Sequence, residues 1–461
     1  MRVFVFSFIA LALGAVLVAV SAQTVASPHA WLAPLREDSS RLIKAATEDD
    51  FAWRRLAELT DTHGARLSGS ENLGRAIDWA VRTMKADGLE NVRTERVMVP
   101  RWVRGRESAE IVDPPRSTVT IVGLGGSVGT SPAGLEAEVL VVTSFDDLRG
   151  KAVDARGRIV LFNVPFSGYS ETVTYRTDGA RAAAQHGAVA ALVRSVGPIG
   201  LRTTHTGSVQ YTLGQAPIPA AAISAEDANR IARLSARGRF IRMRLLMEAR
   251  MEPDVESANV IGELRGRERP EEIVLVGGHL DSWDVGAGAS DDGVGCIATW
   301  EALRLMKKLG LRPRRTVRVV LWTNEENGLR GAAAYAEQHA AEAANHVLAL
   351  EADSGVFTPA VLGFSGSAAA RAMMSQVVSL LAPLEFPEVT SGGGGADIGP
   401  IAQAGNVPTM AYLGDAARYF VIHHSAADTV ERITPEEVSR AAAAIAVVSY
   451  AVAEMPERLP R

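Results

Sequence analysis

Apolar and polar positions alternate in blocks along the C-terminal part of the chain, from about residue 258. Short runs rich in β-branched residues, typical of buried strands, are followed by longer segments with a helical stripe of apolar side chains. The runs predict strands within 271–281, 316–328 and 346–355, and the striped segments predict helices within 291–310 and 328–342. Strands and helices that alternate at this spacing predict a mostly parallel sheet with helices on both faces.

The last predicted helix has a clear start in the stretch TPEEV, residues 434–438. Thr434 can accept a hydrogen bond as the N-cap, and Pro435 suits the first helical position. Glu437 completes a capping box with Thr434. The sequence therefore predicts a helix that begins at this point.

The pattern differs upstream. Residues 51–89 predict two amphipathic helices joined by a turn at 64–74, and a strand follows at 91–100. From roughly 130 to 250 the segments are shorter, with strands and helices expected within 157–164, 178–195 and 218–234. We therefore expect a separate smaller α/β unit at 130–250, flanked by residues 23–129 and 251–461 of the main domain.

The N-terminus has the pattern of an export signal. Arg2 precedes an apolar run from Val3 to Val20, and Val20-Ser21-Ala22 offers small residues at the spacing of a cleavage site. We expect residues 1–22 to be a signal peptide and the mature protein to be periplasmic or secreted, without a stable membrane anchor. An uncleaved anchor is the alternative, since the run is just long enough to span a bilayer.

Composition narrows the choice of partners and compartments. The chain has 461 residues, 47% of them hydrophobic and 22% charged, with a net charge of -5. Its basic residues form no block, so we expect no nucleic-acid partner. Cys296 is the one cysteine, which excludes an intrachain disulfide. We expect it to be a buried core thiol.

Acidic residues and histidines gather where the predicted strands end. The stretch GGHLDSWDVGAGASDDGVG, residues 277–295, could be a solvated loop or could gather carboxylates around a cation. The candidates that follow strands or open helices are His279, Asp281, Asp291, Asp292, Glu325, Glu326, Asp353, His423 and His424. Because ligands of parallel sheets bind beyond the carboxyl ends of the strands, we expect these side chains to converge in one crevice.

Convergent carboxylates repel each other, and a divalent cation removes that repulsion. Mixed imidazole and carboxylate ligands suit zinc, with manganese or cobalt as possible substitutes. Five ligands plus water are too many for one tetrahedral zinc ion. They fit two zinc ions bridged by one carboxylate.

Five short motifs in this order resemble the co-catalytic dizinc aminopeptidase and carboxypeptidase family. They are HLD, GASDDGVG, NEEN, EAD and HHSAADT, beginning at residues 279, 288, 324, 351 and 423. A longer likeness, to the carboxypeptidase branch of this family, includes residues 61–77, 310–323 and 446–455. The resemblance implies the zinc exopeptidase fold, an α/β fold with a mostly parallel mixed sheet sandwiched by helices. It also implies that the segment 130–250 is an inserted, smaller protease-associated α/β domain.

The resemblance also implies a role for each site residue. The metal ligands would be His279 and Asp353 for one zinc ion, Glu326 and His424 for the other, and Asp291 as the bridge. The catalytic residues would be Glu325, as the general base, and Asp281, which would orient the imidazole of His279.

Other polar residues near the motifs have weaker assignments. His423 and Asp397, the latter in SGGGGADIGP, are candidate substrate contacts. Asp292 is expected to be a charge at a helix N-terminus and Asp428 a brace for its loop, neither of them a ligand. Outside the motifs, His63, His339 and His346 are expected to be structural, and His186 and His205 to be structural or exposed.

The function implied is a dizinc metallo-exopeptidase that hydrolyses dipeptides or short peptides through a metal-activated water and a glutamate base. A glutaminyl cyclase with one zinc ion and a binding module without metal are the alternatives. The sequence leaves open the preferred peptide, the terminus that is recognised and a possible homodimer.

Overall fold

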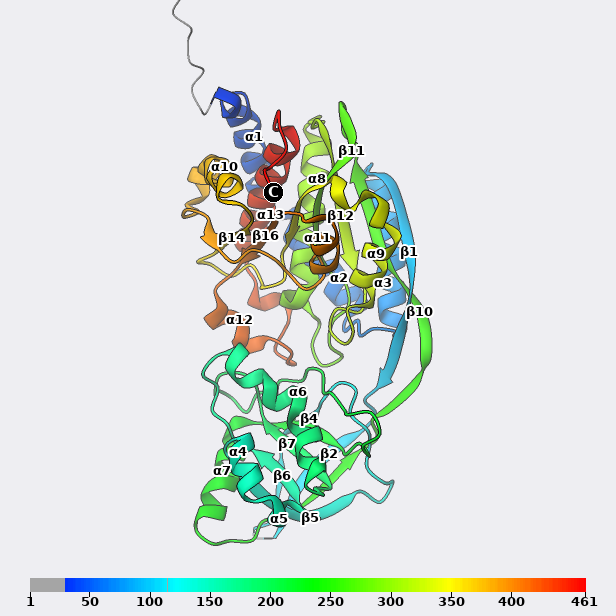
Figure 1. The fold of residues 1–461 in the computed structure, drawn as a ribbon, viewed down its shortest axis with the longest axis vertical. Coiled ribbons are helices and arrows are strands. Elements are labelled where there is room, and N and C mark those ends of the chain that lie inside the picture. Colours follow the sequence, from blue (N-terminus) through cyan, green and yellow to red (C-terminus); the bar gives the residue numbers. More distant parts are fainter. Residues whose placement is uncertain (1–29, 114) are drawn as a thin grey trace, which may run out of the picture.

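The chain folds into a large lobe and a smaller lobe, which lies below the large one in Figure 1. This computed structural model describes residues 30–113 and 115–461. The predicted signal peptide, residues 1–22, lies outside that range. Across the described residues, every helix is too short or too polar to cross a bilayer.

A mixed sheet forms the centre of the large lobe, in the order β1-β10-β12-β11-β13-β16-β14-β15. Its strands are β1 (Glu90–Val103), β10 (Arg250–Leu264), β11 (Arg269–His279), β12 (Arg315–Trp322), β13 (His346–Glu351), β14 (Val361–Ser365), β15 (Thr390–Ser391) and β16 (Thr409–Leu413). The central strands β12, β11, β13 and β16 run parallel. Strands β1 and β10 pair antiparallel with their neighbours, and β14 pairs antiparallel with β16 but parallel with β15. The predicted mostly parallel sheet is confirmed.

Helices cover both faces of this sheet. They are α1 (Leu35–Thr47), α2 (Phe51–His63), α3 (Glu71–Ala86), α8 (Val294–Lys308), α9 (Arg330–Gln338), α10 (Ala368–Val378), α11 (Gly399–Gly405), α12 (Ala416–Ile422) and α13 (Pro435–Glu454). The predicted start of α13 is confirmed: the hydroxyl of Thr434 accepts from the backbone N–H of Glu437, whose side chain accepts from the backbone of Thr434.

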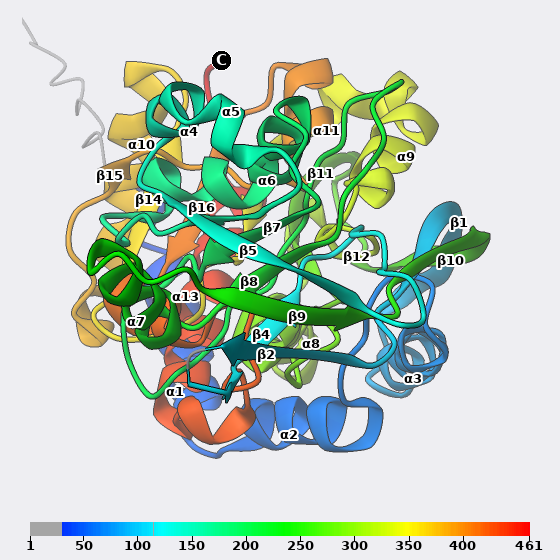
Figure 2. The same cartoon turned by 90° about the horizontal axis from the view of Figure 1, so that it is seen from below.

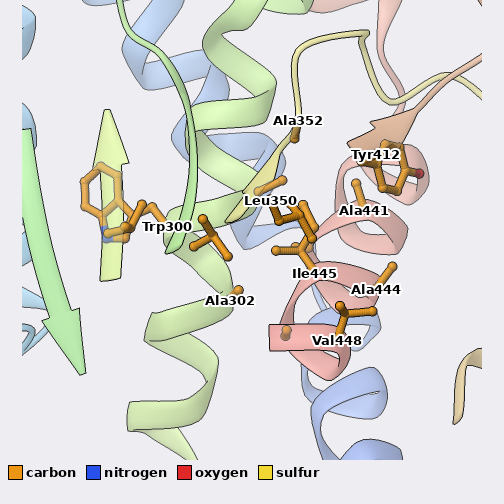
Figure 3. Packing of buried hydrophobic residues seen from close by; sticks show 14 of the residues in the cluster. Trp300, Ala302, Leu350, Ala352, Tyr412, Ala441, Ala444, Ile445 and Val448 are labelled. Atoms are coloured by element: carbon orange, nitrogen blue, oxygen red, sulfur yellow. The ribbon is translucent and has the colours of Figure 1, made fainter. Parts of the chain in front are cut away.

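The core of the large lobe lies where α8 and α13 pack against the sheet (Figure 3). Trp300 of α8, Leu350 of β13 and Ile445 of α13 are fully buried, and Leu350 lies next to Ile445. Alanines fill much of α13, and such small side chains let it approach its neighbours closely. Cys296 is a buried free thiol in this core, as predicted. This packing holds the strand ends, and therefore the site residues, in fixed positions.

The small lobe has its own sheet, in the order β3-β2-β9-β5-β6-β7-β8-β4. Its strands are β2 (Glu107–Asp113), β3 (Ser117–Val119), β4 (Ile121–Gly123), β5 (Leu135–Val142), β6 (Ile159–Phe162), β7 (Ala190–Arg194), β8 (Ala220–Ile223) and β9 (Arg242–Met247). Its helices are α4 (Phe145–Gly150), α5 (Ala152–Ala155), α6 (Tyr169–Gln185) and α7 (Ala225–Ala236). Strands β2, β3 and β4 precede residue 130 and pair with strands of this sheet or with each other.

Two long strands, β1 and β10, connect the lobes (Figure 1). They pair antiparallel from Glu90 opposite Glu263 to Val103 opposite Arg250. Figure 2 looks onto the small lobe, whose sheet lies in front of the large one. The small lobe is thus an insert between β1 and β10, and we call it the insert.

Candidate metal centre

The predicted ligands lie at the carboxyl ends of the central strands. His279 is the last residue of β11, Glu326 follows β12 and Asp353 follows β13. Asp291 belongs to a tight turn just before α8, and His424 follows α12. Because the central strands run parallel, their ends meet at one edge of the sheet and bring these side chains into one site.

Asp291 is at the centre of this site. One carboxylate oxygen, Oδ1, lies 3.2 Å from Nε2 of His279, and the other, Oδ2, lies 3.2 Å from Nε2 of His424. His279 Nε2 is also 3.4 Å from Oδ1 of Asp353, and His424 Nε2 is 3.1 Å from Oε2 of Glu326. The five residues therefore form two adjacent groups that share Asp291.

The donor atoms fit divalent cations. Nε2 of His279 and Oδ2 of Asp291 are buried without a hydrogen-bond partner among the described residues, which is costly unless another group satisfies them. Possible ligand atoms lie within 4.8 Å of one another in three sets. These sets are Asp291–His423–His424, His279–Asp292–Asp353 and His279–Asp291–Glu326. Mixed imidazole and carboxylate donors in this arrangement suit zinc.

Crowded carboxylates shift the titration of the site. Burial raises the pKa of Glu326 to about 7, and the charge of Asp291 adds to the rise. Burial likewise raises the pKa of Glu325 well above its ordinary value, with a contribution from Asp353. Burial alone would raise the pKa of Asp291 too, but the imidazoles of His279 and His424 hold it well below its ordinary value. Divalent cations would relieve this repulsion.

The surroundings of His279 differ in one respect from the expectation. Its Nδ1 donates to the backbone oxygen of Asp281 at 2.9 Å, so a carbonyl and not the carboxylate orients the imidazole. The carboxylate of Asp281 instead accepts from the backbone N–H of Glu325 and from the hydroxyl of Ser68, each at 3.1 Å. Asp281 therefore fixes the backbone of the predicted base.

Asp292 and Asp428 brace the backbone of the ligands. The carboxylate of Asp428 accepts from the N–H groups of Ser290 and Asp291 at 2.7 and 3.1 Å. Asp428 thus holds the turn that carries Asp291, whereas the sequence predicted that it would brace only the loop to which it belongs. Oδ2 of Asp292 accepts from the N–H of His279 at 3.0 Å.

Arg66 fixes the glycine-rich loop and was missed as a site residue. It is fully buried, and its guanidinium donates to the backbone oxygens of Gly64, Leu280, Ala287 and Gly288 at 2.7–2.9 Å. It lies within the stretch 61–77, which the sequence showed only as part of a wider likeness.

The insert forms one wall of the site, which the sequence did not predict. The N–H of Thr206 donates to the backbone oxygen of His424 at 2.8 Å, and the hydroxyl of Ser208 donates to that of Glu326 at 2.9 Å. His205, expected to be structural, donates from Nδ1 to the backbone oxygen of His423 at 2.6 Å. The insert therefore holds the backbone of two predicted ligands.

A cleft of about 360 Å³ opens between the two lobes at these residues. Its lining includes the large-lobe residues Asp291, Glu325, Glu326, Asp353, Ser354, Tyr419, Phe420, His423 and His424, and the insert residues Tyr169 and Arg176. A substrate in this cleft would contact the metal site and the insert together.

The two candidate substrate contacts differ in their position. His423 lines the cleft, and its ring stacks on that of His424 with the centroids 3.6 Å apart. Asp397 is fully buried, and its backbone N–H donates to Oε2 of Glu351 at 3.1 Å. Burial, together with the charge of Glu351, raises the pKa of Asp397 well above its ordinary value. Among the described residues it is not part of the cleft lining.

Comparisons with known proteins show the family of each part of the chain. The family model of peptidase family M28 matches residues 259–449, and that of the PA domain matches residues 119–231. Carboxypeptidase Q of Homo sapiens is 50% identical over 410 residues, which cover 89% of this chain and 87% of that protein. Carboxypeptidase Q of Mus musculus is 49% identical over the same shares.

Solved structures show the same fold. The Peptidase M28 precursor from Shewanella amazonensis superposes with a TM-score of 0.90 at 32% identity and covers 93% of this chain and 98% of its own. The zinc aminopeptidase BSAP from Bacillus subtilis gives a TM-score of 0.66 at 20% identity, covering 89% of this chain and 98% of its own, a likeness of fold alone.

Proposed function

The chain belongs to peptidase family M28 and is a zinc-dependent metallo-exopeptidase with an inserted PA domain, and from this premise we propose that it is an exported dizinc enzyme that hydrolyses dipeptides or short peptides. Export rests on the apolar N-terminal run and its small residues at 20–22. The compartment would be the periplasm or the medium outside the cell.

The position of Asp291 carries the proposal of two metal ions. Each of its carboxylate oxygens faces a different histidine, at 3.2 Å in both cases, as a bridging carboxylate requires. His279 and Asp353 would hold one ion, and Glu326 and His424 the other. When bound, the metal ions lower the pKa of a water molecule and polarise the scissile carbonyl.

Glu325 is proposed as the general base. It lines the cleft, and its Oε2 lies 4.0 Å from Nε2 of His279. Its carboxylate is therefore close to the proposed ligands, although we do not assign it to either ion. The backbone N–H of Glu325 donates to the carboxylate of Asp281 at 3.1 Å, which fixes the position of Glu325. From this position Glu325 would accept a proton from the attacking water and deliver it to the leaving amine.

The alternatives predict different metal contents. A glutaminyl cyclase would need one zinc ion and a binding module none, whereas the proposed ligand set would hold two. The first experiment is therefore zinc stoichiometry on the purified mature protein, together with hydrolysis of a dipeptide panel before and after chelation. Two ions with chelator-sensitive hydrolysis support the proposal, and one or none without hydrolysis contradicts it.

Glu325→Gln separates the base from the ligands. The variant should keep two zinc ions and lose about 10²–10⁴-fold in kcat, because a proton acceptor is removed and no ligand is. Glu326→Gln is the matched comparison and should lose metal as well as activity. Near-normal turnover in Glu325→Gln would show that another group is the base.

A further inference from the structure

Arg176 places a positive charge in the cleft from the side of the insert. It belongs to α6, lines the cleft together with Glu325 and Asp353, and is 5% exposed. Among residues 30–113 and 115–461, no carboxylate lies within 4.0 Å of its guanidinium. A buried cation without an anionic partner is unusual, because removing it from water costs several kcal/mol by general estimates.

The guanidinium is held firmly but is only partly satisfied. Nη2 donates to the hydroxyl of Tyr169 at 2.8 Å, and Nη1 donates to the backbone oxygen of Thr206 at 3.2 Å. Its face lies against Gly207, where an added Cβ would be 2.3 Å from Cζ. Nε is buried and has no partner in the described part of the chain. Arg176 therefore has a fixed position and unused capacity to donate.

Other buried arginines of this protein show how such a charge is normally balanced. Arg318 pairs with Glu263 at 2.7 Å, and Arg55 pairs with Asp87 at 2.5 Å. Arg66 lacks a carboxylate partner, but its donors meet four backbone oxygens. Arg176 has neither arrangement. The acids that line the cleft with it are Glu325 and the proposed metal ligands Asp291, Glu326 and Asp353, and the ions would offset the charges of these ligands.

We propose that Arg176 binds the free α-carboxylate of the residue that follows the scissile bond, so that the enzyme reads the C-terminus of its substrate. This inference rests on the proposed function. The substrates would be dipeptides, and short peptides that lose their C-terminal residue. A planar guanidinium that already has fixed donors is well suited to a carboxylate.

The distance along the cleft fits one residue. Nη1 of Arg176 lies 3.3 Å from Nδ1 of His424, and Nε2 of the same ring lies 3.2 Å from Oδ2 of Asp291. The imidazole ring of His424 therefore lies between the guanidinium and Asp291, the proposed bridging ligand. One residue extends at most about 3.6 Å, and the contacts of the carbonyl and of the carboxylate add about 3 Å at each end, so a carboxylate one residue beyond a carbonyl at the metal site can reach the guanidinium.

Two ligands that differ only in the terminal charge test this assignment: Ala-Leu and its C-terminal amide. In the wild type, kcat/KM for Ala-Leu should exceed that for the amide by about a hundredfold, the effect expected of a buried charge-assisted contact. In Arg176→Ala the ratio should fall close to one, and Arg176→Lys should recover part of it. Arg181→Ala is the matched control. It lies on the same helix, is half-buried outside the cleft lining and pairs with Asp178, so its ratio should equal that of the wild type.

The outcomes separate this inference from the proposed function. If the wild type hydrolyses both compounds equally, the carboxylate assignment is wrong although the enzyme is a peptidase. If Arg176→Ala loses both activities equally together with zinc, Arg176 only supports the loop of His424 and the assignment is also wrong. Calorimetric binding of both compounds to Glu325→Gln requires no turnover. A Kd about a hundredfold lower for the acid supports the assignment even if hydrolysis is absent, and equal Kd values overturn it.

Discussion

Single side chains in this protein hold the backbone of the site as well as its ligands. Arg66 is the clearest case, because one guanidinium donates to the carbonyl oxygens of two segments of the chain. Leaving a buried carbonyl unsatisfied costs about 1–3 kcal/mol. The loop before α8, which carries Asp291, therefore depends on a residue that is more than two hundred positions away along the chain.

Arg66→Lys tests this dependence. An ammonium group is compact and cannot reach four oxygens that are arranged around a planar fork. We expect the free energy of unfolding to fall by at least about 3 kcal/mol and zinc affinity to fall with it. Chemical denaturation and zinc titration measure the two effects. Arg75→Lys, an exposed arginine of the following helix, is the control and should change neither. A variant as stable as the wild type would show that water replaces the lost donors.

At this scale the sequence predicted which side chains lie together better than it predicted their surroundings. The proposed ligands His279, Glu326 and Asp353 could be placed in one site because parallel strands end at one edge, so position along the chain translates into position in space. Arg176, Thr206 and Ser208 could not. They lie far away in the sequence, and Thr206 acts through its backbone, which carries no residue-specific pattern.

Interactions between elements stabilise the edge of the large lobe. His339, at the C-terminal end of α9, contacts Glu342 at 2.6 Å and Glu95 of β1 at 3.0 Å. Arg318 of β12 contacts the same Glu342 at 2.7 Å. Burial alone would lower the pKa of His339, but the carboxylates of Glu342 and Glu95 raise it above its ordinary value. The hydrogen bond from His339 is also the main cause that lowers the pKa of Glu342 to about 2.

These shifts give the cluster a definite pH dependence. A raised histidine pKa adds stability that is fully present below the ordinary value of about 6.5 and is lost as the pH rises through the folded-state pKa. We expect His339→Gln to lower the free energy of unfolding by about 1–2 kcal/mol at pH 6 and by clearly less at pH 9. Denaturant midpoints of the variant and the wild type at both values measure this. Glu337→Gln, on the exposed side of the same helix, is the control, and an equal loss at both pH values would contradict the explanation.

Some helices and strands could be predicted from the sequence more readily than others. The strong alternation from β11 to β13 and the capping box of α13 specified those elements locally, so they were found. Strands β3 and β4 are short, and strands β2 and β4 pair with β9 and β8, which come about a hundred residues or more later. Their strand character depends on those partners, which a local pattern does not reveal.

For the whole molecule, the metal site is also the place where the two lobes meet. Thr206 and Ser208 of the insert donate to the backbone at His424 and Glu326, both proposed ligands. Binding of the ions should therefore stabilise the contact between the lobes as well as each ligand, since metal binding and folding are coupled.

Removal of zinc by a chelator tests this coupling. Without the ions, the repulsion among the carboxylates should loosen the segment 423–429, and the amide of Thr206 should exchange its hydrogen faster. The amides of β6, in the core of the insert, should keep their exchange rates. Restoring zinc to a hundred times its Kd should return about 2.7 kcal/mol of stability per site. Unchanged exchange at Thr206 would show that the lobes meet independently of the metal.

The paired strands β1 and β10 have a consequence for how such a chain can fold. The chain leaves the large lobe at Val103 and returns at Arg250, directly opposite on the neighbouring strand. Inside the insert, β2 and β9 pair as well, with Glu107 opposite Met247, so the insert brings its own ends together. Once it has folded, closing the loop between β1 and β10 carries little further entropic cost. For the large sheet, the whole insert at this place is equivalent to a hairpin turn between β1 and β10, so the order of its strands does not depend on the insert.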